Sequence, residues 1–276
     1  MSWPLLVAGA LDRSAFARAC RLEPDPRQAA LLRSRSRRLA VCTSRQWGKS
    51  TTAAALGASD AYYGAPLTLI VSPTQRQSDE TFAKLKGYLA AALESEADTT
   101  IARESAHVVH ERRPGAGRSV TAAELADEWK VRSLVLQNGA RVVSLPGASE
   151  TIRGFSAVSR VIVDEAAFVD EGLFASVRPM LLVSRGSLVL LSTPNGKRGE
   201  FYRVMSSQDP AWERHLVTWR DNPRIDPADV EVDRRELPVW LFAQEYECEF
   251  TETLGAVFAE REIAGALAPE EASWAV

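Results

Sequence analysis

The residues with the clearest capacity for chemistry lie between a predicted strand and a predicted helix, in the segment Thr43-Ser44-Arg45-Gln46-Trp47-Gly48-Lys49-Ser50. In a loop of this kind, backbone N–H groups and the amino end of the next helix face phosphate oxygens. We expect Lys49 to contact the β- and γ-phosphates of a nucleotide, and the Ser50 hydroxyl to bind Mg²⁺. The usual pattern has Gly in place of Thr43, and Gly-Lys-Ser also occurs in ordinary turns before helices. The predicted nucleotide-binding residues of this loop are Thr43, Ser44, Arg45, Gln46, Trp47, Gly48, Lys49 and Ser50.

A second candidate is the apolar run Val161-Ile162-Val163, which is followed by the carboxylates Asp164 and Glu165. The pattern resembles a Walker B motif. Asp164 would then hold Mg²⁺, partly through water, and Glu165 would orient and polarise the water that attacks the γ-phosphate. Two acids after a strand can also simply begin a helix, where the dipole favours negative charge. The combination with Lys49 favours the catalytic site.

A third candidate is the hydroxyl pair in Ser192-Thr193-Pro194, which follows the apolar run Leu188 to Leu191. Ligands of open α/β sheets bind at the carboxyl ends of the strands, so these hydroxyls could sense the γ-phosphate. The same three residues are also common in ordinary turns.

The elements that must position these residues alternate along the chain, with short strands followed by longer helices. The strands are rich in Val, Ile and Leu without alternation, which is typical of parallel strands covered on both faces. The predicted strands are Leu39 to Thr43, Leu67 to Val71, Arg160 to Asp164 and Ser187 to Ser192. The predicted helices are Ser50 to Tyr62, Gln75 to Leu93, Gly172 to Leu182 and Arg198 to Ser206. The pattern predicts an α/β fold with a mainly parallel central sheet flanked by helices.

Other segments add to this frame. Asn138-Gly139 between Ser133 to Leu136 and Ala140 to Leu145 predicts an antiparallel hairpin, because both central turn positions need positive φ. Residues 98–130 lack a clear period and contain the basic loop Arg112 to Arg118, so we interpret them as an insertion with a flexible loop. After Trp219 the chain becomes acidic, with an amphipathic helix expected from Val239 to Cys248.

Composition sets the outer limits. The 276 residues are 25% charged and 46% hydrophobic, which excludes disordered, collagen-like and coiled-coil chains. No apolar run is long enough to span a membrane, and the first ten residues make a poor signal peptide, so we expect neither membrane insertion nor export. Cys20, Cys42 and Cys248 are too few and too scattered for a disulfide scaffold or a zinc finger, which indicates a reducing compartment.

The net charge of −3 is unevenly distributed. Residues 1–220 hold 29 Lys and Arg against 22 Asp and Glu, whereas residues 221–276 hold 4 against 14. A cationic body could face a phosphate backbone, but a solvated surface with an acidic tail explains the same counts.

Taken in order, the motifs resemble the ATPase domain of the large terminase subunit of tailed bacteriophages. They are Arg45-Gln46-x-Gly48-Lys49-Ser50, Ser72-Pro73-Thr74, Ile152-Arg153-Gly154, Val163-Asp164-Glu165-Ala166-Ala167 and Ser192-Thr193-Pro194-Asn195-Gly196. Gln244-Glu245-Tyr246 and Glu249-Phe250 are similar to the stretch that closes that domain. The resemblance runs from about Pro24 to Phe250, and its specificity lies in the order of the motifs. It implies one ATPase domain over residues 1–250, followed by an acidic tail or the start of a linker over 251–276.

The resemblance also implies a fold and an activity. The fold is a P-loop NTPase of the additional-strand (ASCE, RecA-like) type. The activity is Mg²⁺-dependent ATP hydrolysis that drives double-stranded viral DNA into a procapsid. The implied partners are DNA, the capsid portal protein, the small terminase subunit and further copies of the chain in a ring, in the cytoplasm of the host cell. The nuclease domain that normally follows is absent from this sequence, so we expect no DNA cleavage.

Individual roles follow from the same resemblance. Gln28 matches a glutamine beside adenine, and Arg45 the arginine inside the phosphate loop. Arg153 matches an arginine finger that reaches a neighbouring subunit's ATP, so Glu165, Arg153 and Arg45 are the predicted catalytic residues. Ser192, Thr193 and Pro194 match the coupling motif, which links hydrolysis to domain movement. Ser72-Pro73-Thr74 matches a helicase-like element that couples the ATP state to the grip on DNA.

Two alternatives stay open at this point. A DNA helicase or translocase of the same superfamily would share Lys49, Asp164 and Glu165, although little chain follows Phe250 to form a second RecA-like domain. A nucleotide-gated module could instead grip DNA or a portal with little hydrolysis of its own. In either case DNA could contact the basic stretches Arg33 to Arg38 or Arg112 to Arg118, although such runs are more often solvated surface.

Overall fold

The computed structural model describes residues 7–97, 108–111, 117–120, 132–136, 138–152 and 154–251. Within these ranges one sheet of nine strands has the order β4-β3-β5-β6-β2-β7-β8-β1-β9. The strands are β1 (Arg38–Thr43), β2 (Leu67–Ser72), β3 (Val108–Glu111), β4 (Gly117–Val120), β5 (Ser133–Leu136), β6 (Arg141–Pro146), β7 (Arg160–Asp164), β8 (Ser187–Ser192) and β9 (Glu213–Val217).

Six neighbouring strands, from β6 to β9 in the sheet order, run parallel. Every residue of β2 and β8 is buried, as expected for strands with helices on both faces. β8 lies between β7 and β1 and pairs with both, so the strand that ends in Asp164 does not touch the strand that precedes the phosphate loop. This arrangement confirms the additional strand that the resemblance implied.

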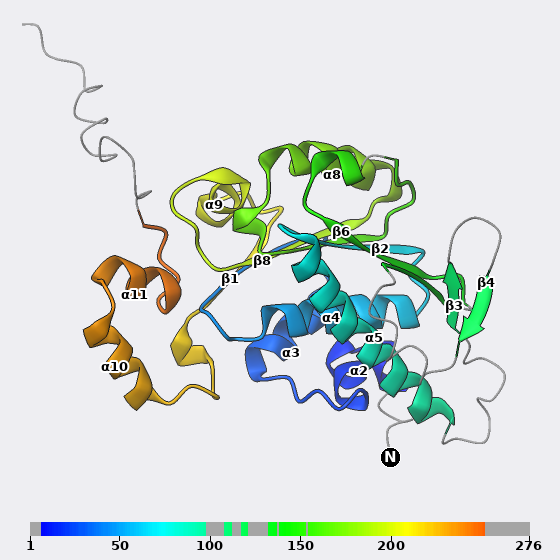
Figure 1. Cartoon of the computed structure of the whole chain (residues 1–276), viewed down its shortest axis with the longest axis horizontal. Helices are drawn as coiled ribbons and strands as arrows, with labels where there is room; N and C mark the ends of the chain where they lie inside the picture. Colours follow the sequence, from blue (N-terminus) through cyan, green and yellow to red (C-terminus); the bar gives the residue numbers. More distant parts are fainter. Residues whose placement is uncertain are drawn as a thin grey trace, which may run out of the picture.

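Helices cover both faces of the sheet (Figure 1). α8 and α9 lie on one face, α2 to α5 lie on the other, and α10 and α11 lie together beside the β1 end of the sheet. The helices are α2 (Arg13–Ala19), α3 (Pro26–Arg33), α4 (Lys49–Tyr62), α5 (Gln75–Ala97), α7 (Ser149–Ile152), α8 (Glu171–Ser184), α9 (Gly199–Ser206), α10 (Pro227–Glu236) and α11 (Val239–Glu245). Two short 3₁₀ helices, η1 (Ala166–Phe168) and η2 (Trp219–Asp221), follow β7 and β9.

The core is divided by the sheet. Phe174 of α8 and Phe201 of α9 pack against one face of it. On the other face, Phe82 and Leu85 of α5 belong to a second cluster, and Trp47 lies in a third cluster with residues of α3 and α4. The predicted phosphate loop and the helix α4 that follows it are therefore both anchored in the core, the loop through Trp47.

The four strands predicted from apolar runs are present, each within one residue of its expected ends. The hairpin around Asn138-Gly139 is also confirmed, since β5 and β6 pair antiparallel. The expected turn is not, because Gly139 has φ +81° but Asn138 lacks the positive φ that this turn requires. The expected helix Val239 to Cys248 ends earlier, at Glu245. Residues 98–130, interpreted as an insertion with a flexible loop, contain the two strands β3 and β4, which extend the sheet. The remainder of that segment and residues 252–276 lie outside the described residues.

In the described part of the chain, no helix is long and apolar enough to cross a membrane. The three cysteines are buried free thiols.

Candidate nucleotide-binding site

The predicted phosphate loop connects the carboxyl end of β1 to the amino end of α4, which begins at Lys49. Gln46 and Gly48 have positive φ values of 56° and 101°, and these fold the loop back over the start of the helix. A Cβ atom at Gly48 would lie 2.8 Å from Nε2 of Gln28, so the position has no room for a side chain. The first N–H groups of α4 lack partners within the helix and are donors for an anion.

Trp47 fixes the loop to the protein. Its side chain is fully buried in the cluster below the loop, beside residues of α3 and α4. The structure makes it a core residue of its own domain.

Gln28, predicted to lie beside adenine, is buried next to the phosphate loop. Its Oε1 accepts a hydrogen bond from the N–H of Asp25 at 3.0 Å, and its Nε2 donates to the carbonyl of Trp47 at 3.2 Å. Asp25 in turn caps α3 by accepting from the N–H of Gln28 at 2.9 Å. Gln28 therefore joins the start of α3 to the loop, and its contact with adenine stays a prediction.

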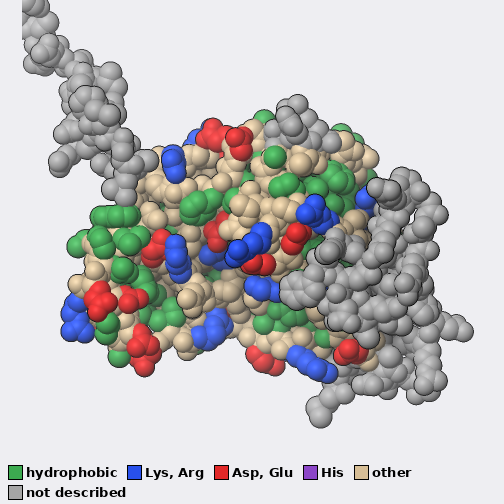
Figure 2. Space-filling model, viewed as in Figure 1, with side chains coloured by type: hydrophobic (Ala, Val, Ile, Leu, Met, Phe, Trp, Pro, Cys, Tyr) green, Lys and Arg blue, Asp and Glu red, His purple; other side chains and the backbone are tan. Residues whose placement is uncertain are grey.

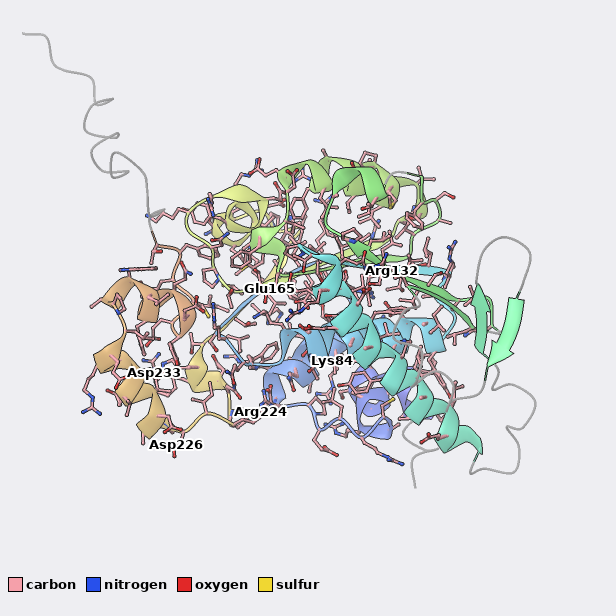
Figure 3. All side chains as sticks on the ribbon, in the orientation of Figure 1. Lys84, Arg132, Glu165, Arg224, Asp226 and Asp233 are labelled. Carbon is pink, nitrogen blue, oxygen red and sulfur yellow. The ribbon has the colours of Figure 1, made fainter. Side chains whose placement is uncertain are left out.

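Two residues that sequence reasoning missed also hold the loop. Arg224 donates to the carbonyl of Trp47 at 2.6 Å and pairs with Asp25 at 3.2 Å. Asn222, which is buried, donates to the carbonyl of Gln46 at 3.4 Å. Figure 3 shows Arg224 beside the amino end of α3. Both residues follow β9, so no local pattern near the loop could have indicated them.

The carboxylate of Glu165 faces the lysine of the loop. Lys49 Nζ lies 3.4 Å from Glu165 Oε1, and the lysine side chain is 9% exposed. Glu165 has φ +55°, in the left-handed region, directly after the buried strand β7. Figure 3 places Glu165 between the helices of the two faces, and Figure 2 shows basic and acidic side chains next to each other in that region.

Burial raises the pKa of the Glu165 carboxyl above its ordinary value. The positive charge of Lys49 opposes this effect, and the negative charge of Asp164 adds to it. A carboxylate that costs energy to keep ionised is a better proton acceptor at neutral pH than an ordinary glutamate. This is the property that a general base requires.

Asp164 is 2% exposed and is held through both of its carboxylate oxygens. Its Oδ2 accepts from the hydroxyl of Thr81 at 3.0 Å, and its Oδ1 accepts from the N–H of Glu165 at 3.1 Å. Thr81 is a buried residue of α5 that sequence reasoning also missed. It lies 83 positions before its partner, so only the fold brings the two together.

The predicted coupling motif touches the same carboxylate. Ser192 Oγ lies 3.4 Å from Glu165 Oε2 and accepts a hydrogen bond from the N–H of Ala167 at 3.1 Å. Ser192 and Thr193 are both buried. Ser192, at the end of β8, is thus hydrogen-bonded to Glu165 and Ala167, directly after the end of β7.

The two predicted catalytic arginines are placed differently. The guanidinium of Arg45 forms an ion pair with Glu245 of α11, and the Arg45 side chain is 71% exposed. It is directed to α11 rather than to the Lys49–Glu165 pair. Arg153 lies outside the described residues, so its role as a finger stays a prediction.

The residues present fit a Mg²⁺ ion whose coordination shell is completed by the phosphates of the substrate and by water. Asp164 and Ser50 offer a carboxylate and a hydroxyl, which are the hard oxygen donors that Mg²⁺ prefers. Within the described ranges there is no cluster of three His, Cys, Asp or Glu that could hold a metal alone. A site of this kind takes its other ligands from phosphate oxygens and water.

The chain matches the family model described as "Terminase large subunit, T4likevirus-type, N-terminal" over residues 41–264. It is 29% identical to the large terminase subunit of Escherichia phage T5 over 252 residues, which cover 86% of this chain and 50% of that protein. The chain therefore spans about half the length of this relative.

Solved structures agree on the fold. The large terminase ATPase domain of Thermus phage P74-26 aligns with a TM-score of 0.65 at 21% identity, covering 86% of this chain and 97% of that one. The large terminase of a thermophilic bacteriophage, solved in complex with ADP, aligns with a TM-score of 0.54 at 13% identity, covering 78% and 49%. With a family match over most of its length and an additional-strand sheet around Lys49 and Glu165, the chain belongs to the terminase large subunits of the T4-like type.

Proposed function

We propose that the chain is a Mg²⁺-dependent ATPase whose hydrolysis of ATP drives double-stranded viral DNA into a procapsid. The observation that carries this proposal is the approach of Lys49 to Glu165, with 3.4 Å between their charged atoms at the carboxyl ends of β1 and β7. One residue is the type that binds phosphate, and the other is the type that activates water. The family match supports this function over the helicase alternative.

In this mechanism the phosphates bind where the first N–H groups of α4 and the Lys49 ammonium converge. Asp164 and Ser50 would hold Mg²⁺, which would supply positive charge to the phosphates when bound. Phosphate oxygens compete with Glu165 for the Lys49 ammonium. Loss of that partner leaves the Glu165 carboxylate free to accept a hydrogen bond from water.

Glu165 then accepts a proton from the attacking water while the water oxygen forms a bond to the γ-phosphorus. The bond from the γ-phosphorus to the bridging oxygen breaks, and the electron pair stays on ADP. Ser192 keeps the Glu165 carboxylate in place from the other side. Movement of Glu165 therefore reaches β8 directly, which supports the coupling role proposed for Ser192, Thr193 and Pro194.

We further propose that Arg153 acts on the ATP of a neighbouring copy, within a homo-oligomeric ring in the host cytoplasm. The remaining partners in the proposal are double-stranded DNA, the capsid portal and the small terminase subunit. The similarity to a phage large terminase subunit over 252 residues supports this assembly.

The test is ATP hydrolysis per subunit over a wide range of protein concentration, with and without double-stranded DNA. Glu165→Gln should bind ATP and lose turnover, because an amide cannot accept the proton of the water. Glu236→Gln, an exposed residue at the end of α10, is the matched control and should hydrolyse like the wild type. Specific activity that rises with concentration supports completion between subunits. Full turnover in Glu165→Gln would contradict the assignment, and ATP binding without hydrolysis at any concentration would indicate a nucleotide-gated module.

A further inference from the structure

A cavity lies at the amino ends of the strands, opposite to the nucleotide site at their carboxyl ends. It has a volume of about 540 Å³ and is lined at the points where β7 and β8 begin, by Arg160 and Ser187. Further walls come from the end of α4 and from the segment before β1. β1, β7 and β8 each span five or six residues, so the cavity and the nucleotide site are separated by roughly 20 Å along the same three strands. A ligand in the cavity would not compete with ATP.

The lining of this cavity has an excess of positive charge. It contains six arginines and a single acid, Asp60. Asp60 is already neutralised, because Arg13 lies 3.1 Å from its Oδ1 and Arg160 forms an ion pair with its other oxygen. The acid therefore balances none of the remaining arginines.

Two of those arginines have no partner among the described residues. Arg33 pairs with Asp12 at 2.9 Å, and Arg35 donates to a backbone carbonyl at 3.2 Å. Arg37 and Arg185 line the cavity without an ion pair or side-chain hydrogen bond to any residue that the structure describes. Both side chains belong to exposed residues, so an incoming anion could reach them.

Hydroxyl groups accompany the arginines. Ser36, Ser59 and Ser187 line the same cavity. Ser59 is fully buried, and its Oγ has no hydrogen-bond partner among the described residues. Buried hydroxyls in proteins are nearly always hydrogen-bonded, so the unpaired Ser59 Oγ is an unusual feature of the cavity wall.

The basic surface continues beyond the cavity. A neighbouring hollow of about 680 Å³ shares Arg37 and adds Arg38 and Arg178, of which Arg178 is paired with Glu200. The same hollow is also lined by Asp209 and by apolar side chains such as Leu182 and Trp212. Arg37 thus stands between two adjoining hollows. This arrangement suits an anion that extends over both, rather than a single small ion.

We propose that this surface, made of Arg37, Arg185 and the two hollows beside them, binds the phosphate backbone of a nucleic acid. Guanidinium groups bind phosphate with two parallel hydrogen bonds, and arginine and serine are the usual protein contacts to a nucleic acid backbone. An acidic peptide would present carboxylates to the same arginines. We favour the polynucleotide because the cavity at the start of β7 and β8 combines six arginines with four serines, which are common contacts to a phosphate backbone, although the neighbouring hollow also has apolar walls. The choice of duplex DNA as the ligand rests on the proposed function.

The experiment measures binding of a fluorescently labelled DNA duplex to the full chain by anisotropy, over a series of salt concentrations. The test variant is Arg37→Ala with Arg185→Ala. The control variant removes two exposed positive charges elsewhere, Lys84 on α5 and Arg235 on α10, by Lys84→Ala with Arg235→Ala (Figure 3 labels Lys84). Arg37→Lys with Arg185→Lys tests whether charge alone restores binding.

We expect the test variant to lose about ten-fold or more in affinity, and the slope of log K against log salt to fall by about 2, one for each lost phosphate contact. The control should change far less. ATP hydrolysis without DNA and the unfolding midpoint should match the wild type in the test and control variants, because the side chains of Arg37 and Arg185 form no hydrogen bond or ion pair with a described residue and lie away from the nucleotide site.

Equal losses in the test and control variants would overturn the proposal, as would wild-type affinity in the test variant. Competition by polyglutamate as strong as that of unlabelled DNA, with the same dependence on the two arginines, would assign the surface to an acidic peptide instead. The two proposals fail separately. A chain that hydrolyses ATP and binds DNA equally well without Arg37 and Arg185 refutes this inference alone, and one that binds DNA through Arg37 and Arg185 but never hydrolyses ATP refutes the proposed function alone.

Discussion

Thr81 gives the sharpest test of how the site is organised. Its hydroxyl donates to Asp164 Oδ2 at 3.0 Å, and both residues are almost completely buried. Thr81→Val keeps the shape of the side chain but removes the donor, which leaves Asp164 with the backbone N–H of Glu165 as its remaining described hydrogen bond. A hydrogen bond to a charged group contributes about 1.5–3 kcal/mol. The variant should therefore be less stable by about this amount in urea unfolding.

The same change should affect Mg²⁺ more than ATP. A carboxylate that has lost one of two positioning bonds presents the metal with a less fixed oxygen, so we expect the Mg²⁺ concentration for half-maximal hydrolysis to rise about ten-fold. ATP affinity measured without Mg²⁺ should not change, because Thr81 bonds to Asp164 rather than to the loop. Thr81→Ser, which keeps the hydroxyl, should restore the Mg²⁺ dependence. If Thr81→Val shows wild-type Mg²⁺ dependence, or if Thr81→Ser is equally impaired, Thr81 does not position Asp164.

Three further predictions concern the loop and Glu165. Gly48→Ala should destabilise the fold by about 1–2 kcal/mol in urea unfolding and abolish ATP binding, because φ is +101° and the new methyl would meet Gln28. Because the pKa of Glu165 is raised, its folded form holds a proton that the unfolded form releases, so stability should fall as pH rises from about 4.5 through the raised pKa. Glu165→Gln should remove this part of the pH dependence and be more stable than the wild type at neutral pH; an unchanged difference between pH 5 and pH 8 would contradict this. Arg224→Ala should raise the KM for ATP several-fold with a stability loss of only about 1 kcal/mol, while Arg235→Ala should alter neither.

The sequence was sufficient to predict the centre of the fold, since buried parallel strands read as uninterrupted Val, Ile and Leu, and the runs at β7 and β8 matched to the residue. β9 was missed because it is an edge strand with the sequence Glu-Arg-His-Leu-Val, in which only Val217 is buried. Its polar side chains give it neither an apolar run nor a strict alternation. Polar residues are tolerated in such a strand because its side chains are partly exposed to solvent.

The same distinction applies to the site. Lys49, Asp164 and Glu165 were predictable because each follows a recognisable strand or begins a helix. Thr81, Asn222 and Arg224 carry no motif, since their role comes from hydrogen bonds to partners 83 to 177 positions away. A single sequence contains no sign of a contact of that kind.

Several of these distant contacts meet at the phosphate loop. Each of the four residues from Ser44 to Trp47 forms a hydrogen bond with a residue of β9 or of the chain that follows it. The N–H of Ser44 donates to the carbonyl of Val217 at 2.8 Å, and the N–H of Arg45 donates to the carbonyl of Glu245 at 3.1 Å. The carbonyls of Gln46 and Trp47 accept from Asn222 and Arg224.

The loop conformation is therefore set by a segment that lies more than 170 residues further along the chain. Without these bonds, the loop carbonyls and N–H groups would be satisfied by water, and nothing would offset the strain of the positive φ at Gln46. A displacement of α11 would also shift Arg45, because Glu245 contacts Arg45 through both its backbone carbonyl and its side chain. Direct bonds therefore connect the position of α11 to the conformation of the phosphate loop.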